Sequence, residues 1–247
     1  MKSNVVDIWS AIFKFLGYLS TFALIRRVFP SLSGSYIFVE SWVFFNLSLS
    51  ISVLILKEFK VLAEILSAFL LIYGVVRVFE IVVYQINVLM FDQYRAEKAG
   101  KKYELRSYRR LMILSIQNYI EILFWFSSFY FYYSECFSNT DLLNTAIGSF
   151  YYSLVTMSTL GYGDVSPVVT VGYLIVIAHT SIGVFLTLMI IARFISLLPK
   201  PETMDSYEKD NKASKPFSPE VKIEVESEQE KRPPQKNLWA DISDKSS

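Results

Sequence analysis

The chain has 247 residues, of which 53% are hydrophobic and 16% aromatic, and its mean hydropathy is +0.36. These values are too high for a soluble domain with a single core. The formal net charge of +1 provides no global field that would attract nucleic acid. With one Cys and one His, the chain has too few ligands for a zinc or iron–sulfur site and cannot form an intrachain disulfide.

The N-terminal segment, residues 1–35, contains an apolar stretch over residues 8–25 that is nearly long enough to cross a membrane. Polar residues recur along it at helical spacing, beginning with Asp7, Ser10 and Lys14. Both a helix lying in the membrane interface and a fifth membrane span fit this pattern, and we expect the interfacial helix. A cleavable signal peptide is a poor interpretation, because two arginines follow where a cleavage site requires small residues.

Four further apolar runs are long enough to span the membrane. About 20 helical residues cross ~30 Å of hydrocarbon, and the runs lie at residues 36–56, 61–91, 111–133 and 170–198. We therefore expect an all-α membrane protein with four transmembrane helices. Residues 36–91 would contain the first two of these helices, and residues 111–198 the last two.

The segment between the second and third spans, residues 92–110, is rich in lysine and arginine. Short basic loops stay on the cytoplasmic side, so both chain termini are expected there and residues 134–169 are expected to face outward. The protein is then a multi-pass protein of the plasma membrane. The tail, residues 199–247, is charged and contains prolines, which predicts disorder. A tail that remains solvated and a tail whose residues 219–226 add a strand to a cytoplasmic partner are both possible interpretations.

Between the third and fourth spans, residues 144–157 are compatible with a helix too short to cross the membrane, so this segment must enter and turn back. Thr159-Leu160-Gly161-Tyr162-Gly163-Asp164 follows directly. Glycines adopt positive φ at low cost, so the carbonyls of this segment can turn toward one line while the side chains of Leu160 and Tyr162 point away. One such strand cannot surround an ion. Several copies around an axis can, which predicts a homo-oligomer.

This segment resembles the filter of the potassium channel family, whose signature is Thr-x-Gly-Tyr-Gly, followed in most members by Asp. The resemblance covers about residues 111–198. It implies a single re-entrant pore helix and filter, passive K⁺-selective conduction by a homotetramer in the lipid bilayer, no enzymatic activity and no cofactor beyond the permeant ions. The ion-coordinating filter would be Thr159, Leu160, Gly161, Tyr162 and Gly163, with K⁺ bound at Thr159, Leu160, Gly161 and Tyr162.

The resemblance also implies roles for residues around the filter. Asp164 matches the acid at the outer mouth, and Tyr151 and Tyr152 stand where many members carry two tryptophans that brace the filter. The Tyr151 hydroxyl would then donate to Asp164. In the fourth span, Gly183 matches the hinge glycine of the family's inner helix, although close helix packing is an alternative interpretation. The residues facing the central cavity would be Val184, Thr187 and Ile191.

We expect structural roles for two ionisable sites in the spans. The second span carries one arginine, Arg77, and an acid one turn away, Glu80; this is not the row of arginines of a voltage sensor, and we expect the two to neutralise each other. His179 is expected to make a structural hydrogen bond away from the pore. Two functions other than a potassium channel remain possible, a non-conducting adaptor subunit and a weakly selective cation channel, but the intact Gly161 and Gly163 favour neither.

Overall fold

The computed structural model describes residues 4–18, 20–28, 36–100, 102 and 107–197. Within these ranges every regular element is helical, apart from an isolated bridge between Phe137 and Pro167. Four helices are long and apolar enough to span a membrane: α3 (Tyr36–Glu58), α4 (Glu64–Ile86) with its helical continuation, α6 (Tyr108–Tyr132) and α9 (Thr170–Leu197). The expected all-α fold with four spans is confirmed. The tail beyond residue 198 is a separate unit that lies outside the described residues, and so does the strand expected at 219–226.

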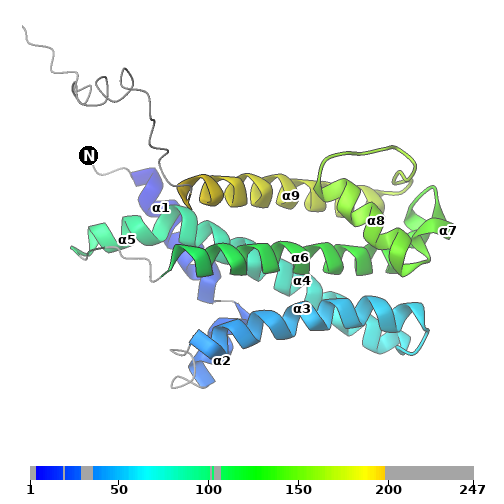
Figure 1. The fold of residues 1–247 in the computed structure, drawn as a ribbon, viewed down its shortest axis with the longest axis horizontal. Coiled ribbons are helices and arrows are strands. Elements are labelled where there is room, and N and C mark those ends of the chain that lie inside the picture. The colour runs from blue at the N-terminus through cyan, green and yellow to red at the C-terminus, as the bar shows by residue number, and fades with distance from the viewer. Residues whose placement is uncertain (1–3, 19, 29–35, 101, 103–106, 198–247) are drawn as a thin grey trace, which may run out of the picture. The chain divides into compact units, whose positions relative to one another are not determined.

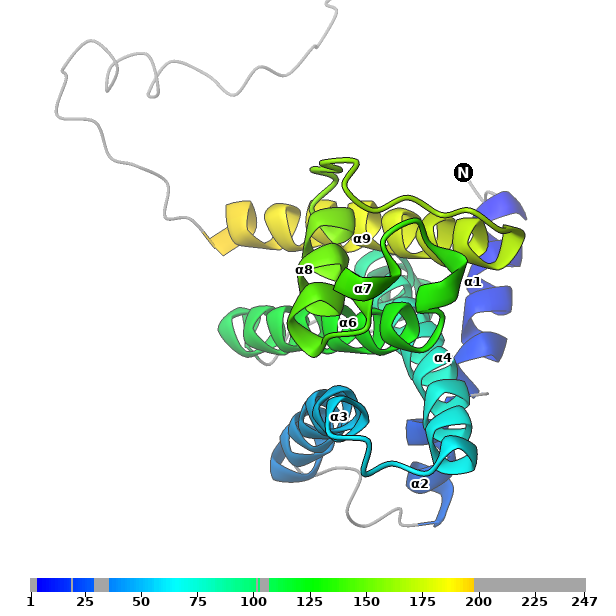
Figure 2. The ribbon, with the colours of Figure 1, turned by 90° about the vertical axis from the view of Figure 1, so that its right-hand side faces the viewer.

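The four long helices run side by side, and α6 is the central one (Figure 1). Seen end-on, α6 lies between α3 on one side and α8 (Ala146–Met157) and α9 on the other (Figure 2). The side chains of Ile122, Trp125 and Tyr130 on α6 are fully buried. Trp125 lies directly against Gly74 of α4, where a Cβ atom would come within 2.5 Å of the indole ring. The missing side chain at Gly74 therefore allows α4 to pack closely on the helix at the centre of the fold.

The second span continues as a helix beyond the end expected at residue 91. A π-helical turn (Asn87–Phe91) joins α4 to α5 (Asp92–Lys98), so the basic segment begins as a helix and not as a loop. The side-chain amide of Asn87 donates to the Val83 carbonyl oxygen at 2.9 Å. The Val83 carbonyl also accepts from the Asn87 backbone amide, so the side chain adds a second donor where the π-helical turn begins.

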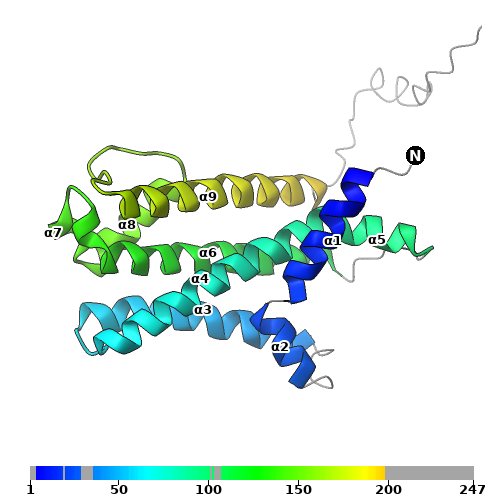
Figure 3. The ribbon, with the colours of Figure 1, turned by 180° about the vertical axis from the view of Figure 1, so that it is seen from behind.

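Two short helices, α1 (Asn4–Tyr18) and α2 (Thr21–Val28), pack at the end of the bundle opposite α8 (Figure 3). Part of the polar stripe of α1 faces the protein, whereas Lys14 is exposed. Ser10 Oγ accepts from Arg95 Nε at 3.0 Å, and the Phe13 carbonyl accepts from Asn87 Nδ2 at 3.0 Å. The exposed face of α1 is the apolar one, with Val5, Ile8, Trp9, Ile12 and Phe15. At 15 residues, α1 is not among the four candidate spans.

Candidate functional site

The short helix expected between the third and fourth spans is present as α8, and its start is specified locally. Thr145 has extended backbone angles (φ −120°, ψ 146°), and its hydroxyl accepts from the Gly148 amide at 3.0 Å. This is the arrangement of an N-cap residue. The 12 residues of α8 span only ~18 Å, so the chain must turn back.

Contacts from both neighbouring helices hold α8 in place. The rings of Phe150 and Phe124 on α6 stack with their centroids 4.8 Å apart, and Ser153 Oγ donates to the Leu123 carbonyl oxygen at 2.8 Å. At the other end of α8, Met157 packs against Gly183 of α9, where a Cβ atom would lie 3.0 Å from the Met157 carbonyl oxygen. Gly183 therefore lies at a close contact between α8 and α9, as the packing interpretation expects, and α9 continues through it as an uninterrupted helix.

The segment after α8 alternates in backbone handedness. Thr159, Gly161 and Gly163 have φ values of 59°, 56° and 78°, whereas Leu160 and Tyr162 are not among the positive-φ residues. In an ordinary extended strand, successive carbonyls point to opposite sides; alternating the sign of φ lets successive carbonyls point the same way. The sequence suggested positive φ at the two glycines but missed Thr159, where this backbone conformation is uncommon and costs energy.

The side chains of this segment are uncovered in a single chain. Leu160 is 57% exposed and Tyr162 is 67% exposed, and no other atom lies within 4 Å of the Cβ positions at Gly161 or Gly163. Exposed large apolar side chains beside an open backbone are typical of a surface that another chain covers.

Two sets of contacts fix the outer end of this segment. Tyr151 Oη donates to Asp164 Oδ2 at 2.8 Å, the contact that the resemblance implied, and the ring of Tyr151 lies parallel to that of Tyr162 at 6.5 Å. Backbone bonds then pair the following residues with the connection after α6: Ser138 N donates to the Ser166 carbonyl and Val168 N donates to the Cys136 carbonyl, both at 2.9 Å.

The stripe of α9 that faces away from α6 and α8 is apolar and exposed, and it contains two of the three residues expected to face a cavity. Val184 is 42% exposed and Ile191 is 49% exposed. Thr187 is half-buried at the edge of the stripe, and its hydroxyl has no hydrogen-bond partner in the part of the chain that the structure describes. The other exposed members of the stripe are Ile177, Ser181, Leu188 and Ile195.

His179 lies on the opposite side of α9 and is fully buried. Its Nδ1 lies 2.9 Å from Tyr130 Oη, and its ring stacks on Phe126 at 3.9 Å. The expected structural hydrogen bond is confirmed.

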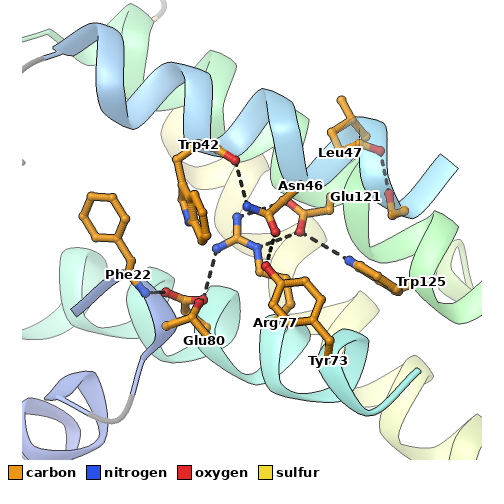
Figure 4. Close-up of polar contacts among 11 residues, drawn as sticks. Phe22, Trp42, Asn46, Leu47, Tyr73, Arg77, Glu80, Glu121 and Trp125 are labelled. Atoms are coloured by element: carbon orange, nitrogen blue, oxygen red, sulfur yellow. Dashed lines mark hydrogen bonds and ion pairs between the residues drawn. The ribbon is translucent and has the colours of Figure 1, made fainter. Parts of the chain in front are cut away.

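Buried charges connect the accessory helices to the pore region. The predicted pairing of Arg77 with Glu80 is confirmed at 3.2 Å, but the shorter contacts of Arg77 are with Glu121 of α6 (Figure 4). Nε and Nη2 of Arg77 donate to the two Glu121 oxygens at 2.7 and 3.1 Å. Glu80 in turn accepts from Thr21 Oγ1 at 2.5 Å and from the Phe22 amide at 2.9 Å, at the start of α2. The three charges therefore join α2, α4 and α6.

The sequence analysis missed two of these roles. It assigns no partner to Glu121, an acid within the third span, and none to Arg193 of α9. Arg193 is 8% exposed, and its guanidinium donates to Ser115 Oγ of α6. The available signal was the same in both cases: an ionisable residue inside an apolar span faces the protein interior and has a partner there.

Comparison with known proteins places residues 119–200 in a family described as ion channel. This region is an ion channel domain. It covers the second half of α6, then α8, the segment of alternating handedness and α9, and it leaves residues 1–118 outside the match. The matched family consists of channels and not of enzymes. No curated protein and no solved structure shows significant similarity to the chain. The chain is thus a multi-pass membrane protein with an ion channel domain between its third and fourth spans.

Proposed function

We propose that the chain is the subunit of a homotetrameric, potassium-selective channel that conducts K⁺ passively across the plasma membrane. The observation that carries this proposal is the alternation of φ at Thr159, Gly161 and Gly163. A run of carbonyl oxygens turned to one side can replace the water shell of a cation, as in the filters of potassium channels. K⁺ would bind at Thr159, Leu160, Gly161 and Tyr162, with Gly163 completing the filter.

The exposed surfaces of the single chain support assembly around the filter. Leu160 and Tyr162 need neighbours to cover them, and the exposed stripe of α9 would face the central axis below the filter. Val184, Thr187 and Ile191 would line the cavity there, with Thr187 as its polar group. Tyr151 and Tyr152 would brace the filter, Asp164 would stand at its outer mouth, and Gly183 would keep α9 close to α8.

The remaining segments complete the proposed arrangement in the membrane. Both termini and the basic residues 92–110 lie in the cytoplasm, by the rule that short basic loops stay inside. The N-terminal segment, residues 1–35, contributes α1 to the cytoplasmic interface with its exposed apolar face toward lipid. The two accessory helices fall within residues 36–91, the pore domain within 111–198 and a cytoplasmic tail within 199–247.

The test is ion flux into liposomes that contain the purified protein, with two matched glycine variants. Gly161 and Gly100 have similar positive φ values, 56° and 65°, and among the described residues no atom beyond the adjacent residues lies within 4 Å of either Cβ position. Alanine therefore costs a similar amount locally at both sites, about 1–2 kcal/mol. Gly161→Ala should abolish selective K⁺ uptake, and Gly100→Ala should leave it unchanged.

The outcomes separate the proposed channel from its alternatives. Uptake of K⁺ and Na⁺ at similar rates by the unmodified protein would indicate a weakly selective cation channel. An assembled protein that takes up neither ion would favour the non-conducting adaptor subunit.

A further inference from the structure

We propose that Glu58, in the last turn of accessory helix α3, is a positioning residue for the filter. Its Oε2 accepts a hydrogen bond from the backbone amide of Ala146, the first residue of α8, at 2.5 Å. Glu58 lies outside the matched channel region, residues 119–200. The inference rests on the proposed function, because it gives an accessory helix a part in shaping the conducting filter.

The Ala146 amide is a group that requires an external partner. The first amides of a helix have no carbonyl within the helix to bond with. The Thr145 hydroxyl supplies a partner for the Gly148 amide, and the ordinary helical bonds begin with Ser149 N, which donates to the Thr145 carbonyl. Glu58 supplies the partner for Ala146, and its negative charge lies at the end of α8 where the helix dipole favours an anion.

A second contact at the same place fixes the end of α3 relative to the pore region. The Nζ atom of Lys57 lies 4.9 Å from the ring centroid of Tyr132, in the last turn of α6. Consecutive residues of α3 thus contact the end of α6 and the start of α8, and α3 also packs against both helices. The start of α8 is therefore tied to the accessory helices as well as to its own neighbours in the pore.

The filter follows directly from the other end of α8. Thr159 N donates to the Thr156 carbonyl and Leu160 N donates to the Val155 carbonyl, both at 3.0 Å, so the first filter residues are bonded to the last turn of the helix. A displacement at Ala146 is carried along a rigid 12-residue helix to this turn. Releasing the start of α8 should therefore shorten the lifetime of the conducting filter.

The contact can be removed from either side, which allows a double-mutant cycle. Glu58→Ala removes the acceptor, and Ala146→Pro removes the donor. Proline is well tolerated at the first helical position, and Thr145 already has the extended conformation that a following proline requires. Glu58→Gln keeps an acceptor oxygen. Glu64→Ala is the matched control, because Glu64 is an exposed acid at the start of α4, in the same turn region as Glu58.

Two readouts are measured on the full-length protein. The first is the mean duration of conducting bursts in planar bilayers at low external K⁺. The second is amide hydrogen exchange in residues 147–157, which does not depend on conduction. Because the contact is exposed and involves one charged acceptor, Glu58→Ala should shorten the bursts by about two- to tenfold and speed exchange in the first turn of α8. Glu58→Gln should retain most of the unmodified behaviour, and Glu64→Ala should retain all of it.

The cycle decides whether Glu58 acts through the Ala146 amide. In the Ala146→Pro background, Glu58→Ala should have no further effect on burst duration or exchange. A full additional effect in that background, or equal effects of Glu58→Ala and Glu64→Ala, would overturn the assignment. If the unmodified protein conducts no K⁺, the proposed function fails, and the exchange measurement still tests the contact by itself.

Discussion

The contact between Tyr151 and Asp164 shows how single side chains stabilise the outer end of the filter. The phenol donates to the carboxylate at 2.8 Å, across the segment of alternating handedness. In the family that the sequence resembles, tryptophans stand at this position and the next. In this chain, the hydroxyl of Tyr151 donates to Asp164 within a single subunit.

Removing this hydroxyl should weaken the conducting filter without affecting assembly. We expect Tyr151→Phe to enter a non-conducting state several-fold faster than the unmodified protein when external K⁺ is lowered, because Asp164 loses a donor that holds the outer mouth. Current decay in planar bilayers measures this rate. Tyr133→Phe is the control, since Tyr133 is an exposed tyrosine at the outer end of α6. Equal decay in the two variants would contradict the role of the hydrogen bond.

At this scale the sequence predicted residue types better than residue conformations. Positive φ at Gly161 and Gly163 followed from the chemistry of glycine, whereas Thr159 has a side chain that disfavours the same conformation. The positive φ of Thr159 follows only from the alternation of φ along the whole segment. Gly183 could be a hinge or a packing residue from its spacing alone, and the position of Met157, which favours packing, depends on the tertiary structure.

Among the helices, α6 connects the accessory region to the pore. It packs against α3 and α4 on one side and against α8 and α9 on the other, and it carries Glu121. Glu121 is fully buried and bonded to Arg77 through both carboxylate oxygens. Removing the Glu121 carboxylate takes the two shortest contacts from Arg77 and leaves Glu80, at 3.2 Å, as its counterion.

Glu121 and Glu40 each pair with an arginine, but Glu121 is buried and Glu40 is exposed, so their substitution should have different effects on stability. Glu121→Gln should destabilise the protein by about 1.5–3 kcal/mol, the usual contribution of a hydrogen bond to a charged group, because Glu80 still balances the charge of Arg77. Glu40→Gln should cost about 0–1 kcal/mol, because Glu40 and Arg110 form an exposed pair with side-chain exposures of 50% and 29%. Thermal unfolding of the purified protein measures both changes. A smaller shift in midpoint for Glu121→Gln than for Glu40→Gln would contradict the structural role of the Arg77 pair.

Helix positions were largely predictable from the length of the apolar runs, because the bilayer sets how many residues a span requires. The faces of those helices were less predictable. The polar stripe of α1 could face water or protein, and the contacts of Ser10 and Phe13 with α5 and the π-helical turn depend on where that turn lies. Glu121 was visible in the sequence, but its partner is 44 residues away and becomes a neighbour only when α4 packs on α6.

For the molecule as a whole, the surfaces left exposed by one chain define what the assembly must supply. The filter segment and the exposed stripe of α9 belong to the same region of the chain, residues 119–200, that matches an ion channel family. Four copies around an axis would cover both surfaces and align four filter segments. The accessory helices would then surround this pore. Glu58 would link α3 to it, and Arg77 would link α4 to it.

The reversal potential of the purified channel in planar bilayers, under opposed K⁺ and Na⁺ gradients, tests the central claim most directly. Carbonyl oxygens on one side of residues 159–163 should select K⁺, so the reversal potential should lie close to the K⁺ equilibrium potential. Gly161→Ala should remove this shift, and Gly100→Ala should preserve it. A reversal potential near zero for the unmodified protein would contradict potassium selectivity.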